Sequence, residues 1–201
     1  GEIHYGVKTA VPAFSFLDPA ADSVGVMYDS EWAKRIEAGL AKEHEGLLKE
    51  GSSWSNIYTG GATQEESHFC GASLGLGDLW RTGKIRNLLL FVFLHFGSCL
   101  RLLALLPIEG ALALWDALRG VMDGHRLKQE LFFIIGRVFV CVGLRELITL
   151  GAKIDLARGL PVIHVNFLGY DEQSHRRGPG SHFAHWTLLG IDRAIRHLHR
   201  A

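Results

Sequence analysis

The sequence has little cysteine and no excess of charge of either sign. Its three cysteines, Cys70, Cys99 and Cys141, lie far apart and form no Cys-x-x-Cys pair, so neither a disulfide framework nor a thiolate zinc site is indicated. Lysine and arginine total 21, and aspartate and glutamate also total 21. A chain without net charge has no overall field that would attract a polyanion, so we expect no nucleic-acid polymer as a partner.

Apolar sequence, by contrast, is abundant and concentrated in one region. Hydrophobic residues make up 48% of the chain, which is enough for a sizeable core, and they gather between Leu88 and Leu150. The glycine-rich stretch from Gly71 to Gly83 is typical of a linker. Two apolar runs, Asn87 to Leu106 and Glu130 to Leu150, flank a segment with helical periodicity from Ile108 to Val121. We therefore predict an insertion of three helices.

The first apolar run is long enough to span a bilayer, which takes about 20 residues. Arg101 opposes this interpretation, because an arginine at the centre of a membrane helix costs roughly 2.5–3.5 kcal/mol, and packing the helices together hides the same apolar surface. We expect the region from Leu88 to Leu150 to form a helical cap that is soluble or lies at an interface. Membrane contact through residues 88–150 stays an alternative, and the location is cytoplasmic or peripherally membrane-associated.

The remainder of the chain is organised around a short run from Val162 to Leu168. It is rich in β-branched and aromatic residues with little alternation, which is typical of a strand buried on both faces of a parallel sheet. Gly169 ends the run, and Asp171 and His175 follow at once, where open α/β sheets bind their ligands. The sequence therefore predicts an α/β fold with a central strand and a functional loop beyond it.

Asp171 and His175 are the candidate metal ligands of this loop. A carboxylate oxygen and an imidazole nitrogen form a donor set that suits zinc and, less well, manganese or magnesium. The alternative is that Asp171 caps a turn and that His175 is a solvated histidine. Arg176 and Arg177, which follow, either neutralise an anionic substrate or are themselves solvated.

The spacing Asp171-x-x-x-His175-x-x-Gly178-Pro179 after a buried strand resembles the metal-ligand segment of the type I phosphodiesterase and nucleotide pyrophosphatase family, a branch of the alkaline phosphatase superfamily. The string from Phe183 to Asp192 is also similar to bacterial members of that superfamily. The resemblance implies a three-layer α/β fold with a parallel sheet, of which this chain is a part that carries a helical insertion. It also implies two catalytic divalent metals, zinc or else manganese or magnesium, with Asp171 and His175 as ligands of one.

In that family, a Ser or Thr hydroxyl attacks the phosphorus of a small phosphate-ester or nucleotide-like substrate and forms a phosphoenzyme. The family's nucleophile, its other Asp and His ligands and its first-strand Asp have no counterpart here. We therefore expect an internal piece of a larger hydrolase, inactive alone, with α/β parts at 1–83 and 151–201 and the insertion at 84–150. Within Thr59-Gly-Gly-Ala-Thr63, Thr59 is a further candidate nucleophile, although a tight glycine turn explains the same residues.

Other histidines are interpreted as structural. His182 and His185 lie three residues apart on a predicted helix, a spacing that can share a metal, but the start and the solvated face of the helix explain them. His164 alternates within the buried strand and is interpreted as a core histidine. Two other classes of function stay open: a catalytically silent relative that keeps Asp171 and His175 for loop structure, and a membrane- or partner-docking module built on residues 88–150.

Overall fold

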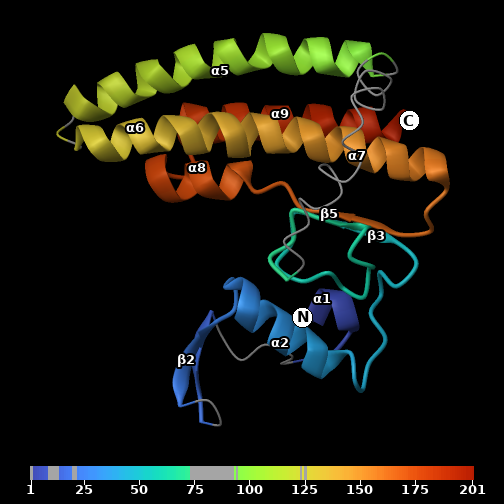
Figure 1. The fold of residues 1–201 in the computed structure, drawn as a ribbon. Helices are drawn as coiled ribbons and strands as arrows, with labels where there is room; N and C mark the ends of the chain where they lie inside the picture. The colour runs from blue at the N-terminus through green and yellow to red at the C-terminus, as the bar shows by residue number, and fades with distance from the viewer. Residues whose placement is uncertain are drawn as a thin grey trace. The chain divides into compact units, whose positions relative to one another are not determined.

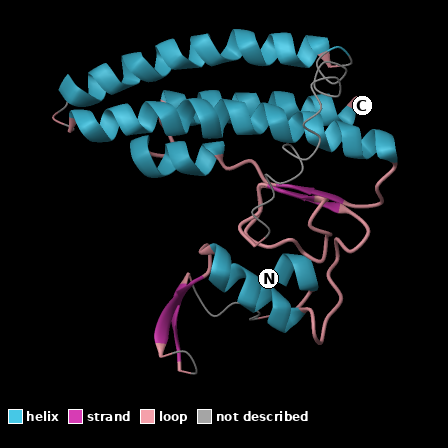
Figure 2. Cartoon of the chain, viewed as in Figure 1, coloured by secondary structure: helices cyan, strands magenta, loops and turns pink. Residues whose placement is uncertain are grey.

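The computed structural model describes residues 2–8, 14–19, 22–72, 93, 95–122, 124 and 126–201. The chain divides into two compact units. Unit 1 comprises Gly1–Gly83 and Ile154–Asn166, and unit 2 comprises Lys84–Lys153 and Phe167–Ala201. Helices dominate the described chain, and strands are few and short (Figure 2). The sequence placed residues 151–201 in one α/β part, whereas in the structure the residues after Asn166 belong with the helices.

Unit 1 contains a parallel sheet of three short strands in the order β4-β3-β5. The strands are β3 (Ser52–Trp54), β4 (Ser67–His68) and β5 (Ile163–Val165). The central strand β3 is fully buried, and Gly51 lets it approach β5, because a Cβ on Gly51 would lie 2.1 Å from the carbonyl oxygen of Val162. The parallel α/β sheet predicted from the sequence is present.

The predicted place of the last strand in this sheet is wrong. Residues from Val162 to Leu168 were expected at the centre, but β5 is shorter and forms an edge of the sheet within the described residues. The reason is that Phe167 already belongs to unit 2 and that helix α8 begins at Gly169. The last two residues of this run, Phe167 and Leu168, therefore lie outside the sheet.

The rest of unit 1 is a hairpin and two helices. The hairpin pairs β1 (Ser15–Asp18) with β2 (Ser23–Val26), and the helices are α1 (Glu2–Tyr5) and α2 (Ser30–Leu40). Asp29 caps the N-terminus of α2, because its carboxylate accepts hydrogen bonds from the backbone N–H groups of Glu31 and Trp32.

A buried carboxylate holds the glycine turn of unit 1 in place. Glu37 of α2 is only 8% exposed. Its carboxylate accepts hydrogen bonds from the Tyr5 hydroxyl at 3.0 Å, the Thr59 hydroxyl at 2.9 Å and the backbone N–H groups of Thr59 and Gly60 at 3.0 and 2.7 Å. Gly60 and Gly61 have positive φ angles, which glycine adopts without strain. Four donors thus converge on one internal anion.

Unit 2 is a bundle of helices. Its elements are α5 (Phe96–Met122), α6 (Leu127–Gly136), the π-helix η1 (Arg137–Leu144), α7 (Arg145–Arg158, of which the residues from Ile154 belong to unit 1), α8 (Gly169–Arg177) and α9 (His182–His199). Helix α5 packs on α6 and η1, and α8 packs on η1 and α9, as Figure 1 shows.

Helices are present in the described part of the region from Leu88 to Leu150, with other boundaries than those predicted. Helix α5 continues through Pro107 and so joins the expected first run to the expected segment from Ile108 to Val121. The residues 87–92 of the first run lie outside the described part of the chain. The second run forms α6, η1 and the start of α7 without a break.

We predict that Glu37→Ala lowers the free energy of unfolding by about 2–4 kcal/mol, because it leaves several buried donors without an acceptor. The measurement is urea-induced unfolding monitored by circular dichroism. Glu43→Ala serves as the control, since Glu43 is exposed and its replacement is expected to change stability by about 0.5 kcal/mol or less. Equal stabilities of the two variants would contradict the role assigned to Glu37.

Candidate functional site

Asp171 and His175 face the same side of helix α8. The segment expected to be a loop is a helix, and a separation of four residues places two side chains on one helical face. Their Oδ1 and Nε2 atoms are 3.4 Å apart, and the side chains are 78% and 81% exposed, respectively. A carboxylate oxygen and an imidazole nitrogen can therefore reach one point in the solvent. The pair lies on an open surface and not in the cleft that we expected.

Helix α8 is positioned by glycine packing at its start and by a turn at its end. A Cβ on Gly169 would lie 2.9 Å from Cα of Cys141 in η1 and 3.0 Å from a methyl carbon of Thr187 in α9. Only glycine permits this close approach of three helices. At the other end, Gly178 has a φ angle of +87° and ends the helix before Pro179. The Gly178-Pro179 pair of the motif thus has a structural role.

Arg176 and Arg177 point into the bundle. Arg177 contacts the carboxylates of Asp116 at 3.2 Å and Glu130 at 3.0 Å, and Arg176 contacts Glu130 at 2.6 Å. Both expectations for these arginines, a substrate contact or full solvation, are therefore wrong. Their charges are used to attach α8 to α5 and α6.

Three potential metal ligands come together at one place in the described residues, and this place is in unit 1. Ligand atoms of Glu66, His68 and Asp155 lie within 4.8 Å of one another. However, Asp155 accepts hydrogen bonds from Ser52 at 2.6 Å and Trp54 at 2.8 Å. The guanidinium of Arg158 supplies positive charge beside these carboxylates.

Arg158 forms ion pairs with both carboxylates of this group. Its Nη2 atom is 2.5 Å from Glu66, and its Nη1 atom is 3.2 Å from Asp155. Hydrogen bonding to Arg158 lowers the pKa of Glu66. His68 stacks on the ring of Trp54 with 4.0 Å between the ring centroids. These contacts explain the group as a structural ion pair that links α7 to the sheet.

The Thr59 hydroxyl is held by the carboxylate of Glu37 in this structure. It donates to Glu37 at 2.9 Å, and the same carboxylate takes the N–H groups that a glycine turn can offer to an external anion. The oxygens of Glu37 are shared among several donors, so the arrangement holds a turn. The structure supports the tight-turn interpretation of this segment.

A pair of histidines lines a cavity of about 510 Å³ in unit 1. The Nε2 atom of His4 lies 3.1 Å from Nδ1 of His164, and their rings meet edge to face. Burial, and then the proximity of His164, lowers the pKa of His4 to about 4, and burial also lowers the pKa of His164. Both rings are therefore neutral at pH 7 and share one hydrogen bond.

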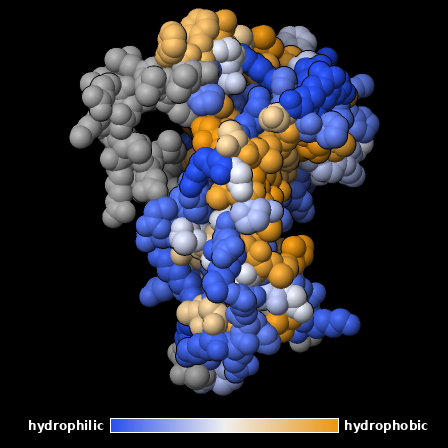
Figure 3. Space-filling model, turned by 90° about the vertical axis from the view of Figure 1, so that its right-hand side faces the viewer, coloured by the Kyte–Doolittle hydropathy of each residue, from blue (hydrophilic) through white to orange (hydrophobic). Residues whose placement is uncertain are grey.

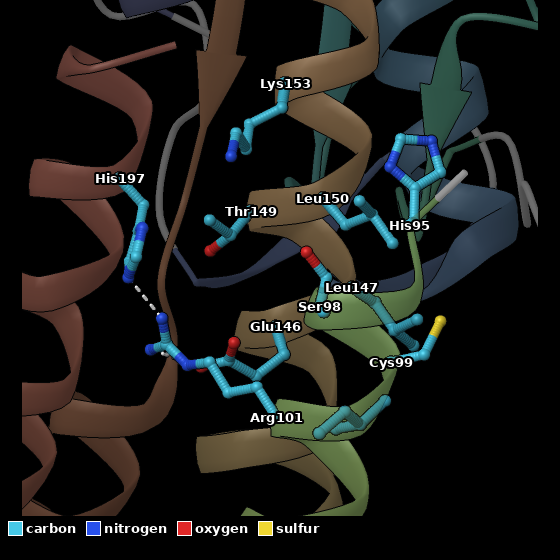
Figure 4. Close-up of a pocket in the computed structure, with 12 residues that line it drawn as sticks. His95, Ser98, Cys99, Arg101, Glu146, Leu147, Thr149, Leu150, Lys153 and His197 are labelled. Atoms are coloured by element: carbon cyan, nitrogen blue, oxygen red, sulfur yellow. Dashed lines mark hydrogen bonds and ion pairs between the residues drawn. The ribbon is translucent and has the colours of Figure 1, made fainter. Parts of the chain in front are cut away.

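A second cavity, of about 490 Å³, lies among helices of unit 2 (Figure 4). Arg101 of α5 points towards His197 of α9 and hydrogen-bonds with it, and it also pairs with Glu146 of α7 at 3.3 Å. Lys153 and Thr149 line the same cavity. The charge of Arg101 is thus already paired with that of Glu146 at this cavity.

The sequence analysis missed the buried charges of unit 2. Glu109, Asp116, Glu130 and Arg137 are all buried. Arg137 Nη2 lies 3.5 Å from Glu109 and its Nη1 lies 3.8 Å from Asp116. The signal was present in the sequence, because isolated charges inside apolar helices are stable only when they pair.

The histidine pair leads to a pH prediction. A histidine whose pKa is lowered in the folded state binds protons more readily when unfolded, so stability falls as the pH drops from 6.5 towards 4. We predict that His4→Gln reduces this loss by about 2 kcal/mol at pH 4.5, judged from the lowered pKa. Urea unfolding of the parent and the variant at several pH values between 4.5 and 8 measures this loss of stability. Parallel curves for the parent and the variant would refute the assignment.

Comparisons with known proteins add no family to these observations. No family model, no curated protein and no solved structure matches this chain.

Proposed function

We propose that this chain contributes to a metal-dependent phosphoric ester hydrolase of the phosphodiesterase and nucleotide pyrophosphatase type. In this proposal Asp171 and His175 supply two ligands of one catalytic metal ion. The three-layer arrangement of the alkaline phosphatase superfamily belongs to the same proposal. The substrate is a small phosphate ester or a nucleotide-like molecule.

One observation carries the proposal: the Asp171 and His175 side chains are 3.4 Å apart on an exposed helical face. An oxygen donor and a nitrogen donor at this separation fit a shared zinc ion. The order of the elements along the chain agrees with the resemblance, because α8 follows β5, a strand of the parallel sheet.

The chemical roles of the two residues differ. Asp171 offers an anionic oxygen, and His175 offers the lone pair of a neutral imidazole. A protonated imidazole has no lone pair for a metal ion. Protons therefore compete with the metal ion for the ring nitrogen of His175. A divalent ion bound there supplies Lewis-acid stabilisation of a phosphoryl oxygen.

Two ligands are fewer than the three protein ligands that catalytic zinc sites use. We therefore expect the 201-residue chain to bind zinc weakly and to hydrolyse phosphate esters negligibly. The remaining ligands and the nucleophile come, in this proposal, from other parts of a longer protein.

Zinc binding by the chain tests the ligand pair. We predict that Asp171→Asn and His175→Gln each weaken zinc binding by about tenfold or more, because each removes one of two donors. The measurement is isothermal titration calorimetry at neutral pH, with circular dichroism to verify folding. His185→Gln on α9 is the matched control, since His185 is also an exposed helical histidine. Equal affinities in all of these proteins would exclude the pair as a site.

Turnover in a longer protein that contains the chain tests the catalytic role. We predict that His175→Ala removes most hydrolysis of a nitrophenyl phosphate mono- or diester assayed with zinc or manganese, whereas His185→Ala leaves it nearly unchanged. Unaltered turnover in the His175 variant would contradict the proposal. Zinc-dependent turnover by the 201-residue chain alone would reveal a nucleophile within it, with Thr59 the first to be replaced.

A further inference from the structure

Unit 2 exposes many apolar side chains on α5, α6 and η1. We call this set the apolar face, and its members are Phe96, Leu100, Leu103, Ile108, Leu114, Trp115, Leu118, Leu131, Ile135 and Phe139. At 100° per residue, most of the members on α5 fall along one side of the helix. Figure 3 shows hydrophobic residues gathered at the top of unit 2, where Figure 1 places α5.

Helix α5 does not have the burial of a soluble core helix. It is 27 residues long and apolar enough to cross a membrane, yet only 11% of its most apolar 18-residue window is buried. A core helix of the same composition would be mostly covered by protein. The helix instead turns its charged residues Glu109 and Asp116 inwards and its leucines outwards. This distribution is the reverse of that in a water-soluble bundle and is typical of helices in contact with lipid.

Helices α8 and α9 carry exposed charges. Helix α8 packs on η1, on which α5 also packs, and it exposes Asp171, Glu172 and His175. Helix α9 exposes Asp192 and Arg196, which form an ion pair at 2.8 Å, beside the apolar residues Trp186, Leu188, Leu189 and Ile195. Exposed charges thus accompany the apolar residues on α8 and α9, whereas exposed apolar residues predominate on α5.

The edge of the apolar face carries groups suited to lipid headgroups. The guanidinium of Arg119 stacks over the ring of Trp115 at 5.2 Å, and both residues are exposed near the end of α5. Arg126 and Lys128 are exposed at the start of α6. Tryptophan and long basic side chains concentrate at membrane interfaces, where the ring or the aliphatic stem lies in the apolar layer and the charge reaches the phosphates.

The contacts of α9 decide between a helix that crosses the bilayer and one that lies in its surface. Trp186 of α9 donates a hydrogen bond to Glu109 of α5, and His197 hydrogen-bonds with Arg101. Asp192 lies between these two contacts along α9. If α5 crossed the bilayer upright, the exposed Asp192–Arg196 pair would lie at the depth of the first half of α5, within hydrocarbon. Charges are expelled from that depth.

We propose that unit 2 binds anionic lipid bilayers as an interfacial module, with the apolar face in the acyl layer and α8 and α9 towards water. In this orientation Asp171 and His175 stay accessible to soluble ligands. The proposal does not depend on metal binding by these two residues, and its test needs neither metal nor substrate.

Flotation with vesicles of phosphatidylcholine and a minority of phosphatidylglycerol tests the proposal. We expect the parent chain to float with the vesicles and Leu103→Asp/Leu114→Asp to lose about tenfold or more in partition coefficient, because both side chains lie on the apolar face, 66% and 51% exposed. Leu189→Asp on α9 is the matched control, because Leu189 is also half-exposed, and it is expected to float like the parent. Circular dichroism verifies that all variants are folded.

Two outcomes of this experiment would overturn the proposal. One is equal flotation of the parent and the double variant. The other is a parent chain that stays with the aqueous phase and forms a dimer, measured by light scattering, that the double variant abolishes. That result would show that a second copy of the chain covers the apolar face.

Depth measurements separate an interfacial helix from a transmembrane one. Nitroxide labels at Leu103→Cys, Leu114→Cys and Leu189→Cys, in a Cys99→Ser background, are compared by their accessibility to oxygen and to a nickel chelate. We expect similar, shallow burial of the two α5 labels and a water-exposed label on α9. Deep burial of the α9 label, or strongly unequal depths along α5, would contradict the interfacial orientation.

Discussion

The buried ion pairs of unit 2 are the constraint on which the rest of that unit depends. Glu130 of α6 is fully buried between Arg176 and Arg177 of α8, and Asp116 of α5 is shared between Arg177 and Arg137 of η1. Because an unpaired charge in such a site costs several kcal/mol, these helices can pack together only in arrangements that keep every pair. The ion pairs therefore fix which side of each helix faces inwards.

The exposed Asp171–His175 pair on α8 and the apolar face on α5 both follow from this inward orientation of the charged side chains. On α8, Gln173 and Arg177 occupy the buried side, so helical geometry places Asp171 and His175 together on the other side. On α5, Glu109, Ala113 and Asp116 are buried, so the leucines point outwards. A polar interior thus accounts for an apolar exterior on α5 and for an accessible pair of metal donors on α8. The glycine turn of unit 1 uses the same principle on a smaller scale, with Glu37 as an internal anion.

The sequence predicted those features that depend on local pattern. Parallel pairing in an α/β sheet and a run of helices between Leu88 and Leu150 were anticipated from periodicity and residue type. The prediction failed where parts of the chain far apart in the sequence decide. The edge position of β5 depends on pairing with β3, about 110 residues earlier, and the burial of Glu37 depends on donors from Tyr5 and Thr59. A window of sequence shows neither. Metal binding by Asp171 and His175 stays a prediction, although the structure brings their side chains together.

Anomalous diffraction at the zinc edge, from crystals grown with zinc, tests the central claim most directly. The account predicts a peak within about 2.0–2.2 Å of both a carboxylate oxygen of Asp171 and an imidazole nitrogen of His175. A zinc peak elsewhere, with the Asp171 and His175 pair free of metal, would contradict it.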